Sequence, residues 1–219
     1  MKSKIIIILF FSFVLNSFSQ NINWRNLTNE KTHIISINFG LDYGSTLGLG
    51  YGYQLNTKLP TVLNAEFSIP FGEKSIDDFK TKIGGQIEII HIGSFSTTLK
   101  AHSVFRRFEN NLSRLLNFGS EFTAVSGYYK TNWYVAGEFG FDKAIVTHVK
   151  HSDLMKENNP NIKTGWYIPS GGNYFYGIQS GYCFGNNDLS LRAGKVIEQD
   201  FKTNPFIPFY FQLGYNRKL

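Results

Sequence analysis

Long stretches of this chain alternate between apolar and polar residues, and this alternation limits the possible folds more than any other feature. In residues 47–55 the pattern is strict, and its apolar members are Leu47, Leu49, Tyr51, Tyr53 and Leu55. Three glycines and Gln54 stand between them. Successive side chains of a β-strand point to opposite faces of a sheet. The segment is therefore predicted to be a strand with one apolar and one polar face.

The same period of two recurs along the chain and predicts about ten strands. They cover residues 33–43, 47–55, 63–71, 80–91, 95–107, 115–129, 132–145, 173–184, 188–197 and 206–216. Most are well beyond the ~5–6 residues usual in soluble sheets, and a tilted strand needs ~9–11 residues to cross a bilayer. No segment has the 3.6-residue apolar period of a substantial helix. The predicted fold class is all-β, an antiparallel transmembrane β-barrel of about ten strands.

Alternation by itself leaves open whether the apolar face meets lipid or points inward, as in a soluble lipocalin-like barrel. Three further patterns favour lipid. Connections after even-numbered strands are short and those after odd-numbered strands tend to be longer, although the first hairpin is tight. Glycines gather on the polar face, where small residues make room inside a narrow barrel. Aromatic residues stand on the apolar face toward strand ends, as in interfacial girdles: Tyr51, Tyr53, Trp133, Tyr174, Tyr176 and Tyr215.

The first twenty residues have the pattern of a cleaved export signal. Lys2 and Lys4 give a basic start, residues 5–15 form an apolar run, and small residues follow at Ser17 and Ser19. Cleavage is expected directly after this segment. The alternative, an N-terminal membrane anchor, fits less well because the apolar run is well short of the ~20 residues of a spanning helix.

The predicted organisation is therefore a signal peptide over residues 1–20 and one outer-membrane β-barrel domain over residues 21–219. Residues 21–32 and the C-terminus are expected in the periplasm. The formal charge of +6 is scattered rather than clustered, so no nucleic-acid partner is predicted. Cys183 is the only cysteine, which excludes an internal disulfide.

The C-terminal stretch carries a family resemblance. Phe209, Phe211, Leu213 and Tyr215 alternate with other residues, and this resembles the assembly signal of bacterial outer-membrane proteins. Those proteins usually finish on an aromatic residue, whereas residues 216–219 follow here. With the export signal, residues 33–216 resemble the class of small bacterial outer-membrane β-barrel proteins. The resemblance implies the outer membrane of a Gram-negative cell, with membrane lipid and the barrel assembly machinery as partners. It does not fix a function.

The polar face of the predicted strands holds acids and bases in similar numbers. The predicted lumen-lining residues are Asp42, Glu66, Lys82, Glu88, Lys100, His102, Arg106, Glu121, Glu138, Asp142 and Arg192. Similar numbers indicate mutual neutralisation, because an unpaired charge in a poorly hydrated interior is unfavourable. They form either a selectivity lining or a structural plug of salt bridges. The plug is favoured because a ten-stranded barrel has little free bore.

No catalytic, cofactor or metal site is predicted. Omptin-like proteases use acids and histidines at the outer rim, but their paired spacing is not reproduced here. Membrane lipid A deacylases use a serine and a histidine on one strand face, whereas His102 and Ser103 are adjacent and point to opposite faces. His148 and His151, three residues apart in a predicted loop, are weak evidence for a metal.

Two classes of function remain, with a membrane-embedded hydrolase behind both. The first is a structural or porin-like barrel with a largely plugged polar lumen. The second is a surface binding protein or adhesin that presents the predicted loop over residues 147–172. Conductance in planar bilayers separates these two, and a lipid or peptide hydrolysis assay tests the third.

Overall fold

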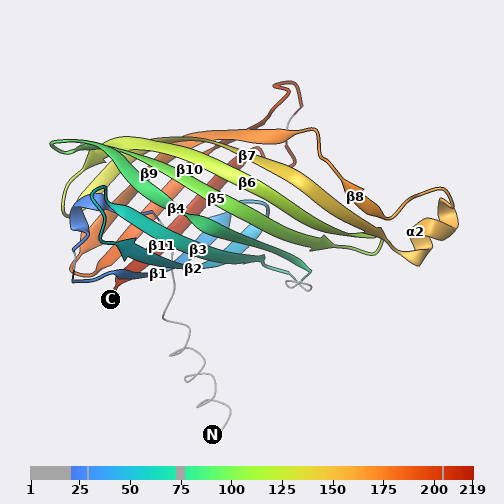
Figure 1. The fold of residues 1–219 in the computed structure, drawn as a ribbon, viewed down its shortest axis with the longest axis horizontal. Helices are drawn as coiled ribbons and strands as arrows, with labels where there is room; N and C mark the ends of the chain where they lie inside the picture. Colours follow the sequence, from blue (N-terminus) through green and yellow to red (C-terminus); the bar gives the residue numbers. More distant parts are fainter. Residues whose placement is uncertain (1–20, 29, 73–76, 204) are drawn as a thin grey trace, which may run out of the picture.

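Ten antiparallel strands close into a barrel in the computed structural model of the protein, which describes residues 21–28, 30–72, 77–203 and 205–219 (Figure 1). The predicted export signal, residues 1–20, lies outside the described residues. The strands of the barrel are β1 (His33–Leu41), β2 (Ser45–Leu55), β3 (Thr61–Pro70), β4 (Asp78–Ile92), β5 (Phe95–Glu109), β6 (Ser113–Tyr129), β7 (Trp133–His151), β9 (Gly172–Phe184), β10 (Asn187–Glu198) and β11 (Phe209–Lys218). Each strand pairs with the next in this order, and β11 pairs with β1. The predicted fold class is confirmed.

Three short elements complete the described chain: the 3₁₀-helix η1 (Trp24–Asn26), the helix α2 (Asp153–Asn158) and the strand β8 (Gly165–Tyr167). The prediction of one continuous loop over residues 147–172 is wrong in part. β7 continues to His151 because β6 begins at Ser113 and offers it a partner, and β8 pairs with the same part of β7. Backbone groups that find a partner stay in the ladder.

No helix within the described ranges is long and apolar enough to cross a membrane.

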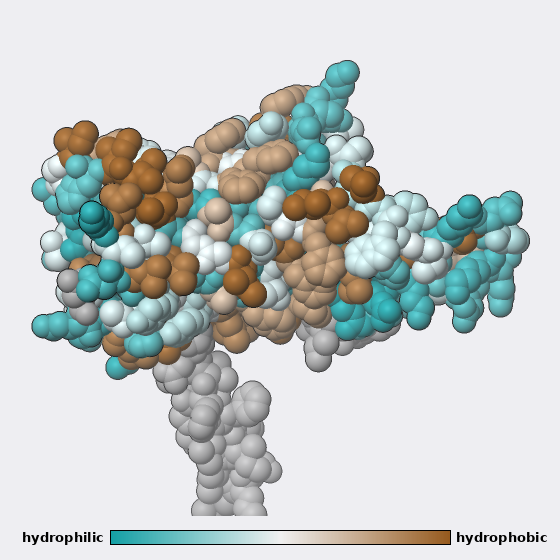
Figure 2. All heavy atoms as spheres, viewed as in Figure 1, coloured by the Kyte–Doolittle hydropathy of each residue, from teal (hydrophilic) through white to brown (hydrophobic). Residues whose placement is uncertain are grey.

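Apolar side chains point out of the barrel and polar ones point in, which follows from the period of two. In β2, Leu49 is 43% exposed, whereas Thr46 is 1% exposed. Figure 2 shows apolar residues over the flank of the barrel and hydrophilic residues over α2. A soluble barrel with an inward apolar face is therefore excluded.

The two ends of the barrel differ in their connections. At one end, named here the turn end, lie the short connections at residues 56–60, 93–94, 130–132 and 185–186 and the C-terminus (Figure 1). Gly93 and Gly185 have φ values of +60° and +57° in these turns, a backbone conformation that favours glycine. The opposite, loop end carries α2, β8 and the connection over residues 199–208. In outer-membrane barrels the short turns are periplasmic and the long loops external.

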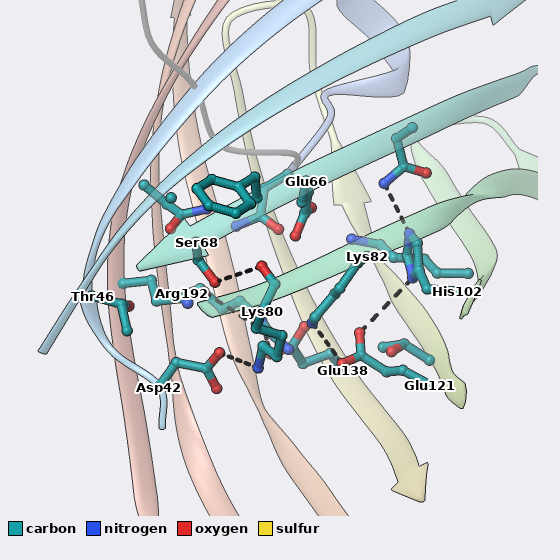
Figure 3. Close-up of a pocket in the computed structure, with 18 residues that line it drawn as sticks. Asp42, Thr46, Glu66, Ser68, Lys80, Lys82, His102, Glu121, Glu138 and Arg192 are labelled. Carbon is teal, nitrogen blue, oxygen red and sulfur yellow. Dashed lines mark hydrogen bonds and ion pairs between the residues drawn. The ribbon is translucent and has the colours of Figure 1, made fainter. Parts of the chain in front are cut away.

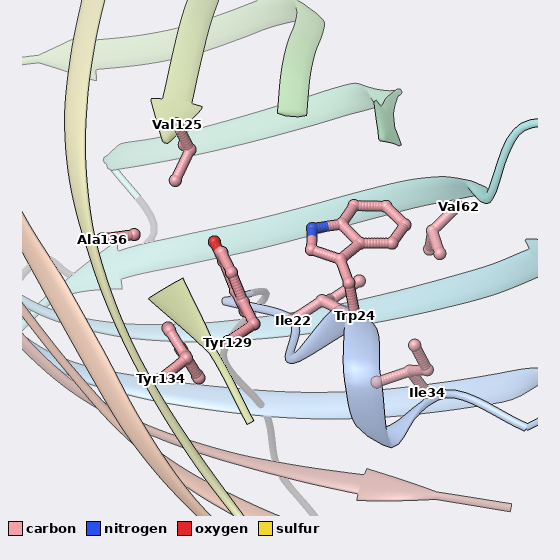
Figure 4. Packing of buried hydrophobic residues seen from close by; sticks show 8 residues of the cluster. All are labelled: Ile22, Trp24, Ile34, Val62, Val125, Tyr129, Tyr134 and Ala136. Carbon is pink, nitrogen blue, oxygen red and sulfur yellow. The ribbon is translucent and has the colours of Figure 1, made fainter. Parts of the chain in front are cut away.

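The N-terminal segment, residues 21–27, lies inside the barrel at the turn end, a position within the lumen that the sequence did not predict. Residues 21–27 are named here the N-terminal plug. Ile22 and Trp24 pack against apolar side chains that point inward from four strands (Figure 4): Ile34, Val62, Val125, Tyr129, Tyr134 and Ala136. Burying one large apolar side chain stabilises a fold by about 1.5–3 kcal/mol. This burial draws the segment into the lumen.

The last strand also differs from its prediction. β11 spans Phe209–Lys218 rather than residues 206–216. It starts later because Pro208 has no backbone N–H, although its carbonyl still accepts from Val196 N. It ends later because Lys218 N donates to the Asn186 carbonyl across the turn. Three of the four residues that extend past the assembly-signal pattern thus complete a strand.

Candidate functional site

The lumen is wide at the loop end and narrow in the middle. A vestibule of about 710 Å³ opens at the loop end. Below it lies an inner cavity of only about 60 Å³ (Figure 3). Both are bordered by Asp42, Lys82, Glu121 and Arg192. These residues therefore form the constriction between the two spaces.

Two ion pairs cross the lumen at this constriction. Lys82 Nζ of β4 lies 2.6 Å from Glu121 Oε2 of β6, and Arg192 Nε of β10 lies 2.6 Å from Glu138 Oε1 of β7. Each pair joins two strands that are separated by a third. A third ion pair joins Lys80 to Asp42, and both of these residues border the two spaces. Figure 3 shows these side chains converging from several strands.

Aromatic rings hold the Arg192 side chain in place. Its guanidinium lies 4.6 Å from the ring centroid of Tyr210 and 5.4 Å from that of Phe175. The Tyr210 hydroxyl donates a hydrogen bond of 2.5 Å to Glu138 Oε1, the oxygen that also faces Arg192. Glycine is needed beside this hydroxyl, because a Cβ at Gly194 would lie 2.3 Å from it. The ion pair is therefore held at both partners: the Tyr210 and Phe175 rings contact Arg192, and the Tyr210 hydroxyl hydrogen-bonds Glu138.

A second arginine is fixed at the wall of the vestibule. Arg106 donates from Nε and Nη2 to the two carboxylate oxygens of Asp78, at 2.9 Å each, and lies 4.4 Å from the Tyr43 ring centroid. The Tyr43 hydroxyl donates to the Ser68 carbonyl at 2.9 Å. Burial of this turn residue raises the pKa of Tyr43 to about 12, so the hydroxyl stays neutral. Bidentate geometry of this kind gives a strong, oriented pair.

His102 faces the inner cavity, where Asn64 Nδ2 lies 2.8 Å from its Nε2. Nδ1 lies 3.9 Å from Glu121 Oε1, too far for a hydrogen bond. Ser103 is exposed on the opposite face of β5. The two side chains therefore do not form a serine–histidine pair.

Two more ion pairs lie at the turn end. Arg25 Nη2 of η1 is 2.6 Å from Glu88 Oε1, and Lys218 Nζ is 3.0 Å from Asp188 Oδ2. The carboxylates of both pairs are 1% exposed. Asp188 is on the same, inward face of β10 as Arg192, so the alternation in the sequence could have predicted that it enters the lumen. Arg25 precedes the first strand and has no such pattern.

All eleven residues predicted to line the lumen point inward. Eight border the inner cavity, Arg106 and Asp142 border the vestibule, and Glu88 contacts the N-terminal plug. The fold pairs Arg192 with Glu138, and Glu88 with Arg25. Glu66 and Lys100 both border the inner cavity.

The structure offers no set of metal ligands within the described ranges, where no three His, Cys, Asp or Glu side chains gather. His148 and His151, predicted in a loop, belong to β7. The His148 ring packs edge-on against Trp166 of β8, with ring centroids 4.9 Å apart. A packing role accounts for this histidine.

A closed ten-stranded antiparallel barrel with an apolar outside and a polar inside defines a small outer-membrane β-barrel protein, porin-like in its architecture. No protein-family model and no curated protein matches the chain. Among solved structures, it is similar to KdgM porin in complex with disordered oligogalacturonate (TM-score 0.44) and to KdgM porin (TM-score 0.42). Both are 9% identical, and each alignment covers 85% of this chain and 99% of the other. A third, from work titled "Unveiling the Mechanism Behind the in-meso Crystallization of Membrane Proteins", has 6% identity and a TM-score of 0.37 over 86% of this chain and 84% of the other.

Proposed function

We propose that the protein is a porin-like outer-membrane barrel that rests in a closed state, with a polar lumen plugged by its own ion pairs and by the N-terminal plug. One observation carries this proposal: beside the vestibule of about 710 Å³, the lumen within the described residues narrows to an inner cavity of about 60 Å³. Such a cavity has room for roughly four water molecules, at ~15 Å³ of accessible volume each. Below it, the N-terminal plug fills the turn end.

The pairing of the lumen charges supports a plug rather than a selectivity lining. Ions are selected by hydrated charges that are free to interact with them. Here the carboxylates of Glu88, Glu138 and Asp188 are 1% exposed, and each faces a cation at 2.6–3.0 Å. Charges held in this way neutralise one another and bind strands together. Their attraction is not available to a passing solute.

Planar bilayer recording tests the closed state. Refolded wild-type protein, shown to be folded by its heat-modifiable gel mobility, is expected to give no steady current. The variant Arg107→Ala is a matched control, because this arginine pairs with Glu109 outside the lumen. It should be equally silent. Steady conductance by the wild type would contradict the proposal.

The lipid-facing surface implies the partners of this barrel. Membrane lipid contacts the outward apolar residues, and the barrel assembly machinery acts during biogenesis. The outer membrane is the compartment that fits such a surface, with export by the N-terminal signal. Fractionation of cells that express the protein tests this placement, and recovery from the inner membrane would contradict it.

A binding role is the second candidate, because part of the predicted loop over residues 147–172 projects beyond the barrel (Figure 1). On this projection Leu154 of α2 is 54% exposed, and nearer the barrel Trp166 of β8 and Ile168 are 61% and 86% exposed. Exposed apolar groups on a loop are a feature of interaction sites. A variant that lacks residues 153–164 should fold and lose surface binding if this role holds. Equal binding by both forms would exclude it.

A further inference from the structure

The N-terminal plug is buried in the lumen although it is not part of the strand ladder. Asn21, Ile22, Asn23 and Trp24 are 6%, 5%, 0% and 6% exposed, although none of them belongs to a strand. Six inward side chains that pack against Ile22 and Trp24 are apolar, in a lumen that is otherwise polar. Apolar side chains that face a lumen are buried only when something covers them. These six form a receptor for Ile22 and Trp24 (Figure 4).

The contacts that hold the N-terminal plug use side chains. Asn23 Nδ2 donates to the Lys130 carbonyl at 2.7 Å, and Asn216 Nδ2 donates to the Asn21 carbonyl at 2.7 Å. Arg25 donates to Glu88 at 2.6 Å and also to Ser96. The strand ladder closes without the segment, because β1 starts at His33 and pairs with β2 and β11. The plug can therefore leave while the barrel stays closed as a cylinder.

Departure of the plug would join the inner cavity to the turn end, because Asn21 is one of the residues that border that cavity. It would also remove the cation that faces Glu88. Of the two ion pairs described at this end, Asp188 would keep Lys218, whereas the Glu88 carboxylate would lose Arg25. His91 Nδ1 lies 3.9 Å from Glu88 Oε2, and the His91 side chain is half exposed.

We propose that the N-terminal plug is the closing element of a small pore, and that the pore opened by its departure passes small cations in preference to anions. This inference rests on the proposed function, a barrel closed at rest. The Glu88 carboxylate, once it has lost Arg25, gives the preference, because water admitted to the turn end hydrates it and leaves its charge free to attract a passing cation. The constriction at Lys82 and Arg192 limits the size of what can pass.

A disulfide can hold the plug in place for the test. Asn23 Nδ2 lies 3.1 Å from Cys183 Sγ, so a thiol at position 23 is within reach of the natural cysteine. The full-length variant Asn23→Cys/Trp24→Ala loses the amide contacts and the ring that fill the receptor. Reduced, it should conduct in planar bilayers. Oxidised with diamide, it should lose that current as labelling of the two thiols is lost.

Matched variants separate the explanations. Asn23→Ser/Trp24→Ala should conduct before and after diamide, because it has no second thiol. Lys31→Ala, which removes a contact to Asn186 outside the plug, should stay silent. In a KCl gradient the reversal potential of the open variant should shift toward that of K⁺. Adding Glu88→Gln should remove most of this shift.

Each result decides one point. Silence of both loosened variants, with folding shown by gel mobility, overturns the plug as the closing element, whether or not the bridge forms. A current without cation preference, or with a preference that Glu88→Gln leaves intact, overturns the selectivity. Conductance by the wild type overturns the proposed function itself, so the two failures are distinguishable.

Discussion

Replacing Arg192 with alanine tests most directly whether the lumen is a structural plug. The substitution leaves Glu138, whose side chain is 1% exposed, without the cation 2.6 Å from it. Breaking a buried ion pair from one side destabilises a protein by about 3–5 kcal/mol, because the remaining charge stays desolvated. Loss of the contact to the Tyr210 ring adds about 0.5–1 kcal/mol.

Water that enters the lumen reduces the expected loss of stability. Arg192 is 18% exposed and borders the vestibule, so water can enter the space that its side chain leaves. It would reach Glu138 from the loop end only. We therefore expect a loss of about 3–4 kcal/mol, at the lower end of the range for buried pairs. With a urea dependence of about 2 kcal/mol/M, the unfolding midpoint falls by roughly 1.5–2 M.

The assay is urea unfolding of the barrel in lipid vesicles, followed by tryptophan fluorescence. Arg107→Ala removes an arginine from a partly exposed pair outside the lumen and should lower the midpoint much less, by the equivalent of about 1 kcal/mol at most. Arg192→Met/Glu138→Met should recover most of the lost stability, because apolar groups of similar size can replace a buried pair. A shift for Arg192→Ala as small as that for Arg107→Ala would refute the reasoning and indicate a wet lumen.

Three further predictions concern the outer surface and the loops. Leu49→Arg should reduce stability by about 2–4 kcal/mol in the vesicle titration if its outward position is near the bilayer midplane, and a change equal to that of Leu49→Ala would contradict an outward lipid contact. Trypsin added to intact cells should cut at Lys156 in α2 and not at Lys130 in a turn, and the reverse pattern would invert the orientation. The backbone amide of Lys202, and after it other backbone amides, donate to the Asp200 carboxylate and hold its pKa below the ordinary 3.8. The ionised carboxylate therefore orders its loop above about pH 4, and this order is lost as the pH falls through the lowered pKa. In the wild type the amide protection factors of this loop should drop over that pH range, and in Asp200→Asn they should be low at every pH. Protection factors that change neither with pH nor with the substitution would show that the carboxylate does not order the loop.

The strands and the direction of their faces could be predicted because both follow from local backbone geometry. A period of two in residues 47–55 is enough to place Leu49 and Gly48 on opposite faces of a strand, whatever the rest of the chain does. Strand ends could not be read in the same way. β7 continues to His151 because Ser113 lies across from it, and a pairing partner is not a property of the segment itself.

The sequence by itself also determined which charged groups enter the lumen, but not which of them meet. Arg192 and Glu138 are 54 residues apart and on strands separated by β9, so only closure of the barrel brings them together. The position of the N-terminal plug was even harder to predict from the sequence. Its receptor consists of side chains from β1, β3, β6 and β7, and it exists only once these strands surround a common space. Side-chain direction is local, whereas a cavity and the segment that fills it are products of the closed tertiary structure.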